Sequence, residues 1–311
     1  MEQGRRHLPH SCLLATGLIL LLQAWQPAHA WGKQVWRVTE NRHFIAYSDA
    51  SDTKVRKLLA EMEKFRIVVQ TFVHVKIPAD APRTNVVIFD HPVDFMKLTP
   101  RNNIAGFTFR TDENRFFIVM PAKYFWDNSA HDIRHEYVHV VTGYYKFRLP
   151  RWYNEGLAEY MAAVRIKGNE IILGMPPKER AKYAHYAEMY SYDKLLDDQF
   201  NLNKPFNADA YIQFWLLTSY MLSDPEQNKL LAKHITLYNS GMDTLKSFKL
   251  AFGMTPDELY RRKLLKYARH VKEYVIKFDF PGKDTRFSSR AAGKQELDDI
   301  FGILHNVHWN K

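Results

Sequence analysis

The chain has 311 residues, of which 46% are hydrophobic and 25% are charged, so it is long and apolar enough to bury a hydrophobic core. This composition excludes a disordered tail, a collagen-like fibre and a small domain held together by disulfides. The formal net charge is +10, but no five basic residues follow one another, so we expect no nucleic-acid partner. The charge indicates a solvated basic surface or, as an alternative, a weak association with anionic envelope surfaces.

The first 30 residues have the features of an export signal. Arg5 and Arg6 precede an apolar run, Leu13–Leu22, and a small-residue cleavage site ends at Ala30. The run is shorter than the ~20 residues that cross a bilayer, and Cys12 precedes it, which argues against a lipoprotein. We therefore predict a periplasmic or secreted protein. After cleavage it has no cysteine and depends on its core rather than on disulfides.

After this signal the chain predicts a small sheet with one helix. β-rich composition predicts a strand over Val35–Tyr47, and a short apolar run predicts another over Asn85–Phe89. Apolar residues at helical spacing predict an amphipathic helix over Asp52–Phe72. A polar turn between Gly106–Phe109 and Arg115–Val119 predicts a hairpin.

From Ser129 onward the pattern is mostly helical. Thr255-Pro256-Asp257-Glu258 is typical of a helix start, with the threonine as cap and the glutamate reaching back to it. The β-rich segment Val164–Leu173 predicts a second small hairpin between helices. The polar residues 281–311 predict a C-terminal tail with one weak helix near Leu297–Leu304.

Strands and a helix followed by helices predict an α+β fold with two lobes. A small mixed or antiparallel sheet with a helix forms a sheet lobe over about residues 31–125, and a mostly helical lobe follows over about residues 126–280. We expect a binding site in a cleft between two such lobes.

The most informative segment is His135-Glu136-Tyr137-Val138-His139. Residues four apart lie on the same face of a helix, so both imidazoles can bind one metal ion, while Glu136 lies a quarter turn away. The apolar residues of this helix form one stripe, and His135 and His139 point away from it. Histidines of a core would lie within the stripe, so these two face either solvent or a polar cleft.

A second segment offers a third ligand. Gly143 ends the first helix, and Pro150 suits the opening turn of the next, which contains Trp152-Tyr153-Asn154-Glu155-Gly156-Leu157-Ala158-Glu159-Tyr160. This helix can lie beside the first and bring Glu155 within reach of the histidines. Two neutral nitrogens and one carboxylate leave a Zn²⁺ site with an open position for water, whereas four protein ligands would close it.

Together the two segments resemble the gluzincin zinc metallopeptidases, in which HExxH is followed by an NEG-type glutamate. The pattern W-x-x-E-G-x-A-E-Y is most similar to the peptidase MA-like domain of bacterial envelope proteins. The resemblance implies a zincin-like fold in which His135, His139 and Glu155 bind zinc and Glu136 is the general base. It also implies that Glu159 orients a zinc-bound histidine. Fifteen residues lie between His139 and Glu155, fewer than in thermolysin-like or aminopeptidase enzymes.

The chemistry needs a further donor near the oxyanion of the reaction. Tyr211, in Tyr211-Ile212-Gln213, resembles a tyrosine–glutamine segment of peptidase MA-like domains, and Tyr190 is the second candidate. Packing in the helical core is the alternative for Tyr211. In gluzincins an edge strand binds the substrate backbone, and Asn103–Phe107 is the candidate here because Gly106 permits close approach; an ordinary hairpin strand is the alternative.

These residues predict an exported zinc metallopeptidase that acts on a peptide or protein substrate. Zinc would lower the pKa of a bound water, and Glu136 would transfer its proton to the leaving amine. The alternatives are a noncatalytic zinc-fold scaffold of the cell envelope and a zinc hydrolase of a non-peptide bond. The other histidines, His74, His91 and His131, are expected at the surface or at helix caps. Asp132 either orients a ligand or is an ordinary acid of the first helical turn.

Overall fold

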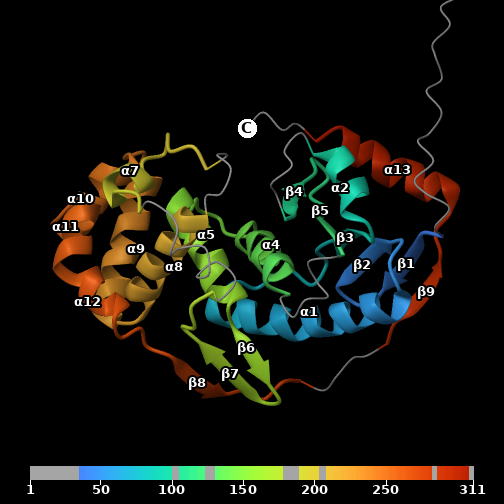
Figure 1. Ribbon diagram of the computed structural model, residues 1–311, viewed down its shortest axis with the longest axis horizontal. Coiled ribbons are helices and arrows are strands. Elements are labelled where there is room, and N and C mark those ends of the chain that lie inside the picture. The colour runs from blue at the N-terminus through green and yellow to red at the C-terminus, as the bar shows by residue number, and fades with distance from the viewer. Residues whose placement is uncertain are drawn as a thin grey trace, which may run out of the picture. The chain divides into compact units, whose positions relative to one another are not determined.

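The computed structural model describes residues 35–99, 105–122, 130–177, 189–202, 208–281 and 286–307. They confirm the α+β class: a mixed sheet and its covering helices adjoin a group of further helices and a smaller sheet (Figure 1). The predicted export signal, with Cys12 and Ala30, lies outside the described residues.

The larger sheet has six strands within the described residues. In order across the sheet they are β4 (Phe107–Arg110), β5 (Phe116–Pro121), β3 (Thr84–Phe89), β2 (Phe44–Ser48), β1 (Arg37–Glu40) and β9 (Ser288–Ala291). β2, β3 and β5 run parallel, and the other strands are antiparallel to their neighbours. The predicted hairpin is confirmed as β4 and β5, which places β4 at one edge of the sheet.

The strand predicted over Val35–Tyr47 is instead two strands, β1 and β2. The side chain of Asn41 accepts hydrogen bonds from the backbone N–H groups of His43 (3.0 Å) and Phe44 (2.9 Å), which turns the chain back on itself. An asparagine that bonds its own backbone two residues on is a turn signal. The β-rich composition on either side of Asn41 concealed it.

Helices cover both faces of this sheet. They are α1 (Asp52–Phe72), which agrees with its predicted range, α2 (Pro92–Leu98), α4 (His131–Thr142) and α13 (Lys294–His305). On one face, α1 and α4 join Val86 and Ile88 of β3 in the main hydrophobic core. On the other, the Phe89 ring lies 6.4 Å from that of Phe95 in α2 and 6.2 Å from that of Phe301 in α13. Because both faces are covered, β3 and β5 are buried along their whole length.

The prediction of a C-terminal tail was wrong for residues 286–307. β9 pairs with β1, and the Ser289 and Thr39 hydroxyls lie against each other and against the carboxylate of Asp52 at the start of α1. The weak helix predicted there is confirmed within α13. The centroid of its Phe301 ring lies 5.1 Å from that of the Trp36 ring. Polar composition conceals a strand whose partner, Thr39 for Ser289, lies 250 residues away in the chain.

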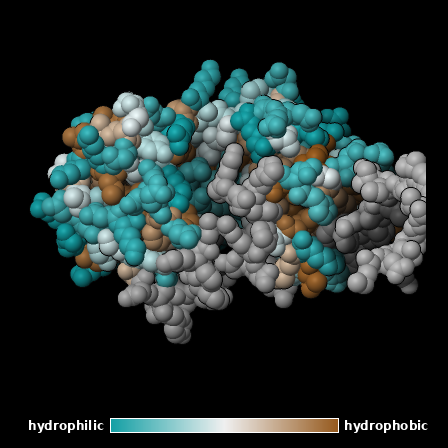
Figure 2. Space-filling view, turned by 90° about the horizontal axis from the view of Figure 1, so that it is seen from above, coloured by the Kyte–Doolittle hydropathy of each residue, from teal (hydrophilic) through white to brown (hydrophobic). Residues whose placement is uncertain are grey.

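The other helices gather on the side of α4 away from the sheet (Figure 1). They are α5 (Arg151–Ala162), α7 (Tyr192–Leu196), α8 (Ala208–Leu222), α9 (Pro225–Asn239), α10 (Thr244–Phe252), α11 (Pro256–Leu259), the π-helical turn η2 (Tyr260–Leu264) and α12 (Leu265–Ala268). The predicted capping box of Thr255 and Glu258 starts α11. Across the described helices, none combines the length and apolar character needed to cross a bilayer. The face seen in Figure 2 is mostly hydrophilic, with smaller hydrophobic groups between.

The smaller sheet contains the second predicted hairpin. β6 (Arg165–Lys167) and β7 (Glu170–Leu173) are joined by a turn in which Gly168 has φ +60°, and β8 (Tyr274–Lys277) adds a third strand beside β7. Only the hairpin is local in sequence, so the pattern predicts the first two strands and not the third.

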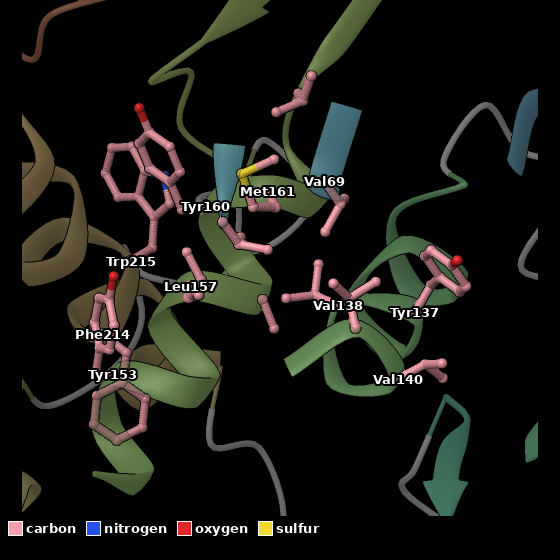
Figure 3. Packing of buried hydrophobic residues seen from close by; sticks show 14 of the residues in the cluster. Val69, Tyr137, Val138, Val140, Tyr153, Leu157, Tyr160, Met161, Phe214 and Trp215 are labelled. Atoms are coloured by element: carbon pink, nitrogen blue, oxygen red, sulfur yellow. The ribbon is translucent and has the colours of Figure 1, made fainter. Parts of the chain in front are cut away.

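α4 is held between the two halves of the structure. Its Tyr137 ring lies 5.3 Å from that of Phe44 in β2, and Figure 3 shows Val138 on the opposite side, toward α5. α5 in turn packs closely on α8: a Cβ on Gly156 would lie 2.2 Å from the Thr218 hydroxyl and 2.6 Å from the Phe214 carbonyl oxygen. Only glycine allows this approach. The positions of α4, α5 and α8 are therefore mutually fixed.

A buried polar chain fastens the start of α5 to α9 and α10. The indole N–H of Trp152 donates to Nε2 of His234 (3.3 Å), so the ring proton must lie on Nδ1, which faces the hydroxyl of Ser247 (3.0 Å). The Ser247 hydroxyl then donates to the Thr244 carbonyl (3.0 Å). Burial lowers the pKa of His234 from 6.5 to about 4. A protonated ring would also set two N–H donors against each other at Trp152.

We predict that His234 makes the fold sensitive to acid. Between about pH 4 and 6.5 the unfolded chain binds a proton on His234 that the folded protein does not, so the unfolding free energy rises with pH across this window. The difference in pKa corresponds to roughly 3 kcal/mol lost on going from neutral pH to pH 4. A His234→Gln variant keeps an acceptor for Trp152 and a donor for Ser247. Between neutral pH and pH 4 its unfolding free energy should fall by roughly 3 kcal/mol less than that of the wild type. Urea unfolding at several pH values measures it.

The exposed His270, changed to Gln, is the matched control and should follow the wild-type pH profile. If His234→Gln kept the wild-type slope between pH 4 and 6.5, another group would be responsible for the acid sensitivity.

Candidate metal centre

Three predicted ligands converge where α4 meets α5. Nε2 of His135 and Nε2 of His139 are 3.1 Å apart, and Oε2 of Glu155 lies 3.3 Å from the first and 3.7 Å from the second. Donors about 2.0–2.1 Å from a tetrahedral Zn²⁺ are about 3.4 Å from one another. Among the described residues these three form a group close enough to hold one metal ion. The donor set and its spacing therefore fit zinc.

Local structure explains why the three side chains meet. α4 ends at Gly143, where a Cβ would lie 2.6 Å from the ring of Phe116, so the chain turns away from β5 at a residue without a side chain. Pro150 precedes α5, whose first turns carry Trp152 and Glu155. The hydrogen bond from Trp152 to His234 fixes this end of α5. Glu155 is thereby held at the level of the two imidazoles.

The side chains alternate between acid and base across the helix contact. Glu155 lies between His139 and His135. Glu159 lies between His135 and His131. Oε1 of Glu159 lies 3.0 Å from Nδ1 of His135, and Oε2 lies 3.4 Å from Nε2 of His131. Glu159 is fully buried. The structure thus places Glu159 next to the ring of His135, and its role in orienting that ring stays a prediction.

His131 was expected at the surface or at a helix cap. It is buried rather than at the surface, and it is the first residue of α4. His131, His135 and His139 are each four residues apart, and Glu155 and Glu159 share that spacing. This common period was the signal that connects His131 to the site. The expectation for His74 and His91 was correct, since both are exposed. Asp132 lies beside His131, with Oδ1 3.6 Å from Nδ1.

The second histidine is oriented by a residue that sequence reasoning missed. Nδ2 of Asn154 lies 3.2 Å from Nδ1 of His139, and its Oδ1 lies 3.1 Å from the Thr142 hydroxyl. With this amide turned over, Oδ1 would accept from the Nδ1–H of a metal-bound His139, and Nδ2 would donate to the Thr142 hydroxyl. An imidazole that binds a metal through Nε2 needs a partner at Nδ1. Asn154 immediately precedes Glu155, so its place in the motif was the available signal.

Opposite charges dominate the electrostatics of the ligands. Burial by itself would lower the pKa of His135, but Glu155 and Glu159 outweigh it and raise the pKa to about 10. Burial would likewise raise the pKa of Glu155, but the charges and hydrogen bonds of His139 and His135 hold it far below its ordinary value. The carboxylate is therefore ionised at neutral pH, and a metal ion bound here would displace the proton of His135.

Glu136 lies on the side of α4 that faces the edge strand β4. A Cβ on Gly106 would be 3.8 Å from Cγ of Glu136, and the hydroxyl of Thr108 donates to the Glu136 backbone carbonyl (3.2 Å). Further along, Arg110 donates to the carbonyl of Gly143 (3.3 Å). β4 therefore runs along α4 beside the predicted general base. Asn103 and Ile104, in the predicted substrate strand, lie outside the described residues.

Tyr211 is brought to the ligands by α8. Its ring centroid lies 5.9 Å from that of His135, at an interplanar angle of 68°. Tyr190 is held differently: its backbone exchanges two hydrogen bonds with the side chain of Gln213 (2.9 and 2.8 Å), and its ring packs on Phe200. Of the two predicted oxyanion donors, Tyr211 is the one in ring contact with a ligand.

Neither the models of known protein families nor the sequences of curated proteins match this chain. The likeness to gluzincins therefore rests on the two sequence motifs, beside which the structure places three residues close enough to hold a metal ion.

We predict that Glu159→Gln weakens zinc binding without removing it. Glutamine keeps the size of the side chain but not the charge that orients His135, and losses of 10- to 100-fold are usual for such partners of a ligand. His139→Ala, which removes a ligand, should reduce affinity further. Competition with a chromogenic chelator measures both. Glu113→Gln, in the exposed turn before β5, is the control and should bind zinc like the wild type. Equal affinity in Glu159→Gln and Glu113→Gln would contradict the role given to Glu159.

Proposed function

We propose that this protein is an exported zinc-dependent metallopeptidase. The observation that carries the proposal is the convergence of His135, His139 and Glu155 with donor atoms 3.1–3.7 Å apart, beside Glu136. A structural zinc site has four protein ligands, whereas a catalytic one has three and keeps a position for water. The segment over residues 1–30 supports export to the periplasm or the exterior.

His135, His139 and Glu155 would hold the ion. Bound zinc supplies a water of lowered pKa and polarises a carbonyl oxygen. Glu136 accepts a proton at its carboxylate and delivers it to the leaving amine, which is the task of a general base and then of a general acid. The hydroxyl of Tyr211 donates a hydrogen bond to the oxyanion that develops on the carbonyl. Glu159 and Asn154 hold the imidazoles in orientation.

The edge strand favours a peptide as the substrate. Within the described residues, β4 pairs with β5 on one side only, so its other side can pair with an extended backbone. Gly106, directly before β4, lies beside Glu136, and the space left by its missing Cβ is filled by Val119 and Met120 of β5. A peptide added to this edge would pass next to the proposed base. An ester or another small amide would not use these backbone groups.

We predict that Glu136→Gln abolishes peptide hydrolysis while zinc stays bound. Glutamine cannot accept the proton, and loss of a general base costs about 10²- to 10⁴-fold in kcat. Cleavage of a mixed peptide library by zinc-loaded protein, followed by mass spectrometry, measures it. Tyr211→Phe keeps the ring next to His135 and removes the hydroxyl. It should lower kcat about 10²- to 10³-fold and leave KM nearly unchanged.

Glu113→Gln, in the exposed turn before β5, is the control for loss of an acid and should cleave like the wild type. Full turnover by Glu136→Gln would show that this residue is not the base. Zinc-loaded wild type that cleaves no peptide would favour a noncatalytic scaffold, and hydrolysis of esters alone would favour a non-peptide substrate.

A further inference from the structure

A second feature of the chain is a group of basic side chains more than 100 residues after the candidate metal ligands. It follows α11 at the end of the helical lobe. Between residues 261 and 272 six side chains are basic and exposed, and we call them the basic segment. They are Arg261, Arg262, Lys263, Lys266, Arg269 and Lys272. The first five lie on η2 and α12 or directly after them, and Lys272 leads into β8 (Figure 1).

The charge of this segment is not neutralised by the rest of the described chain. None of the six side chains forms an ion pair or hydrogen bond with another described residue. The nearest acids on α11 are engaged elsewhere: Asp257 accepts from Ser191 and from the N–H of Tyr192, and Glu258 closes the capping box. Within the segment and the residue after it, Glu273 is the one acid.

Several other surface cations of the described chain are paired, whereas some exposed lysines, such as Lys57 and Lys233, are not. Lys229 lies 2.7 Å from Glu226, Lys294 lies 2.8 Å from Asp298, and Arg290 binds Glu296. The basic segment differs from these ordinary solvated positions, because six cations crowd within twelve residues without a counter-charge. Their mutual repulsion is relieved by an external anion.

Apolar side chains are exposed on the same stretch of chain. Leu265 lies between Lys263 and Lys266 and is 43% exposed, although its neighbour Leu264 is fully buried. Val275 on β8, three residues after Lys272, is 62% exposed. Basic side chains that flank exposed aliphatic ones are typical of elements that lie in a membrane interface, since the cations reach the headgroups while the aliphatic groups enter the acyl boundary.

The aromatic residues of the segment do not offer a platform for nucleic-acid bases. Tyr260 packs on Tyr192 with ring centroids 5.1 Å apart. Tyr267 packs on Tyr220, and its hydroxyl bonds to Ser219. Proteins that bind single strands stack bases on exposed aromatic rings. A lipid surface therefore suits this segment better than a nucleic acid.

We propose that the basic segment docks the protein on a bilayer that carries anionic phospholipid headgroups, with Leu265 inserted at the interface. The segment shares no residue with the metal centre. The proposal therefore stands or falls independently of the proposed peptidase activity.

The test is co-sedimentation of the full chain with phosphatidylcholine vesicles, either pure or containing about one third phosphatidylglycerol. The wild type should bind the anionic vesicles at least about tenfold more tightly, and about 0.5 M salt should remove the difference. The quadruple variant R262Q/K263Q/K266Q/R269Q should lose this preference. The wild type and all variants contain residues 1–34, so any membrane contact of that segment is the same in each of them.

The matched control K57Q/K146Q/K233Q/K249Q removes the same charge from exposed lysines elsewhere and should keep the preference. An equal loss in both quadruple variants would overturn the assignment to this segment, as would wild type without any preference. Leu265→Ser should weaken binding about threefold; unchanged binding would overturn its insertion. Binding of a single-stranded oligonucleotide through the segment, without vesicle binding, would overturn the lipid partner. Zinc affinity should be the same in both quadruple variants, so failure here is distinct from failure at the metal centre.

Discussion

Histidines spaced four residues apart on α4 face glutamates with the same spacing on α5. The candidate site depends on the alignment of these two rows of side chains. Because histidines lie on one helix and glutamates on the other, the buried Glu159 and the partly buried Glu155 each lie between two imidazoles. A buried charge without such a partner would cost several kcal/mol. A shift of α5 by one turn would leave Glu159 unpaired or remove Glu155 from the ligands. The requirement to pair these charges therefore sets the register of the two helices.

The rest of the fold holds that register. α1 and the sheet support α4 from one side, while Gly156 lets α8 approach α5 from the other. Trp152, three residues before Glu155, donates a hydrogen bond to His234 on α9. A helix far along the chain therefore holds the start of α5 in place. α8 also brings Tyr211 to the ring of His135. The candidate metal centre is thus built from helices rather than from loops, as a site of defined geometry requires.

Features that depend on short spacings were predictable from the sequence. The four-residue period of His135 and His139 follows from helix geometry, and so do the helix over 52–72 and both hairpins, whose partners are neighbours in the chain. β9 was missed because a polar strand has no local signature when its partner is at the other end of the chain, although the helix within α13 was predicted. His131 and Asn154 were missed for another reason. Residues that orient a ligand carry no motif of their own, and only the facing helix shows what they touch.

The most direct test of the metal centre is X-ray absorption at the zinc edge on the purified chain loaded with one equivalent of zinc. We predict two imidazoles and further oxygen ligands at about 2.0–2.1 Å from the zinc, and no sulfur ligand. Changing Glu155 to Gln should alter the oxygen shell and leave both imidazoles in place. Failure to take up zinc, or a bound ion with fewer than two imidazoles, would contradict the convergence of α4 and α5 on one metal.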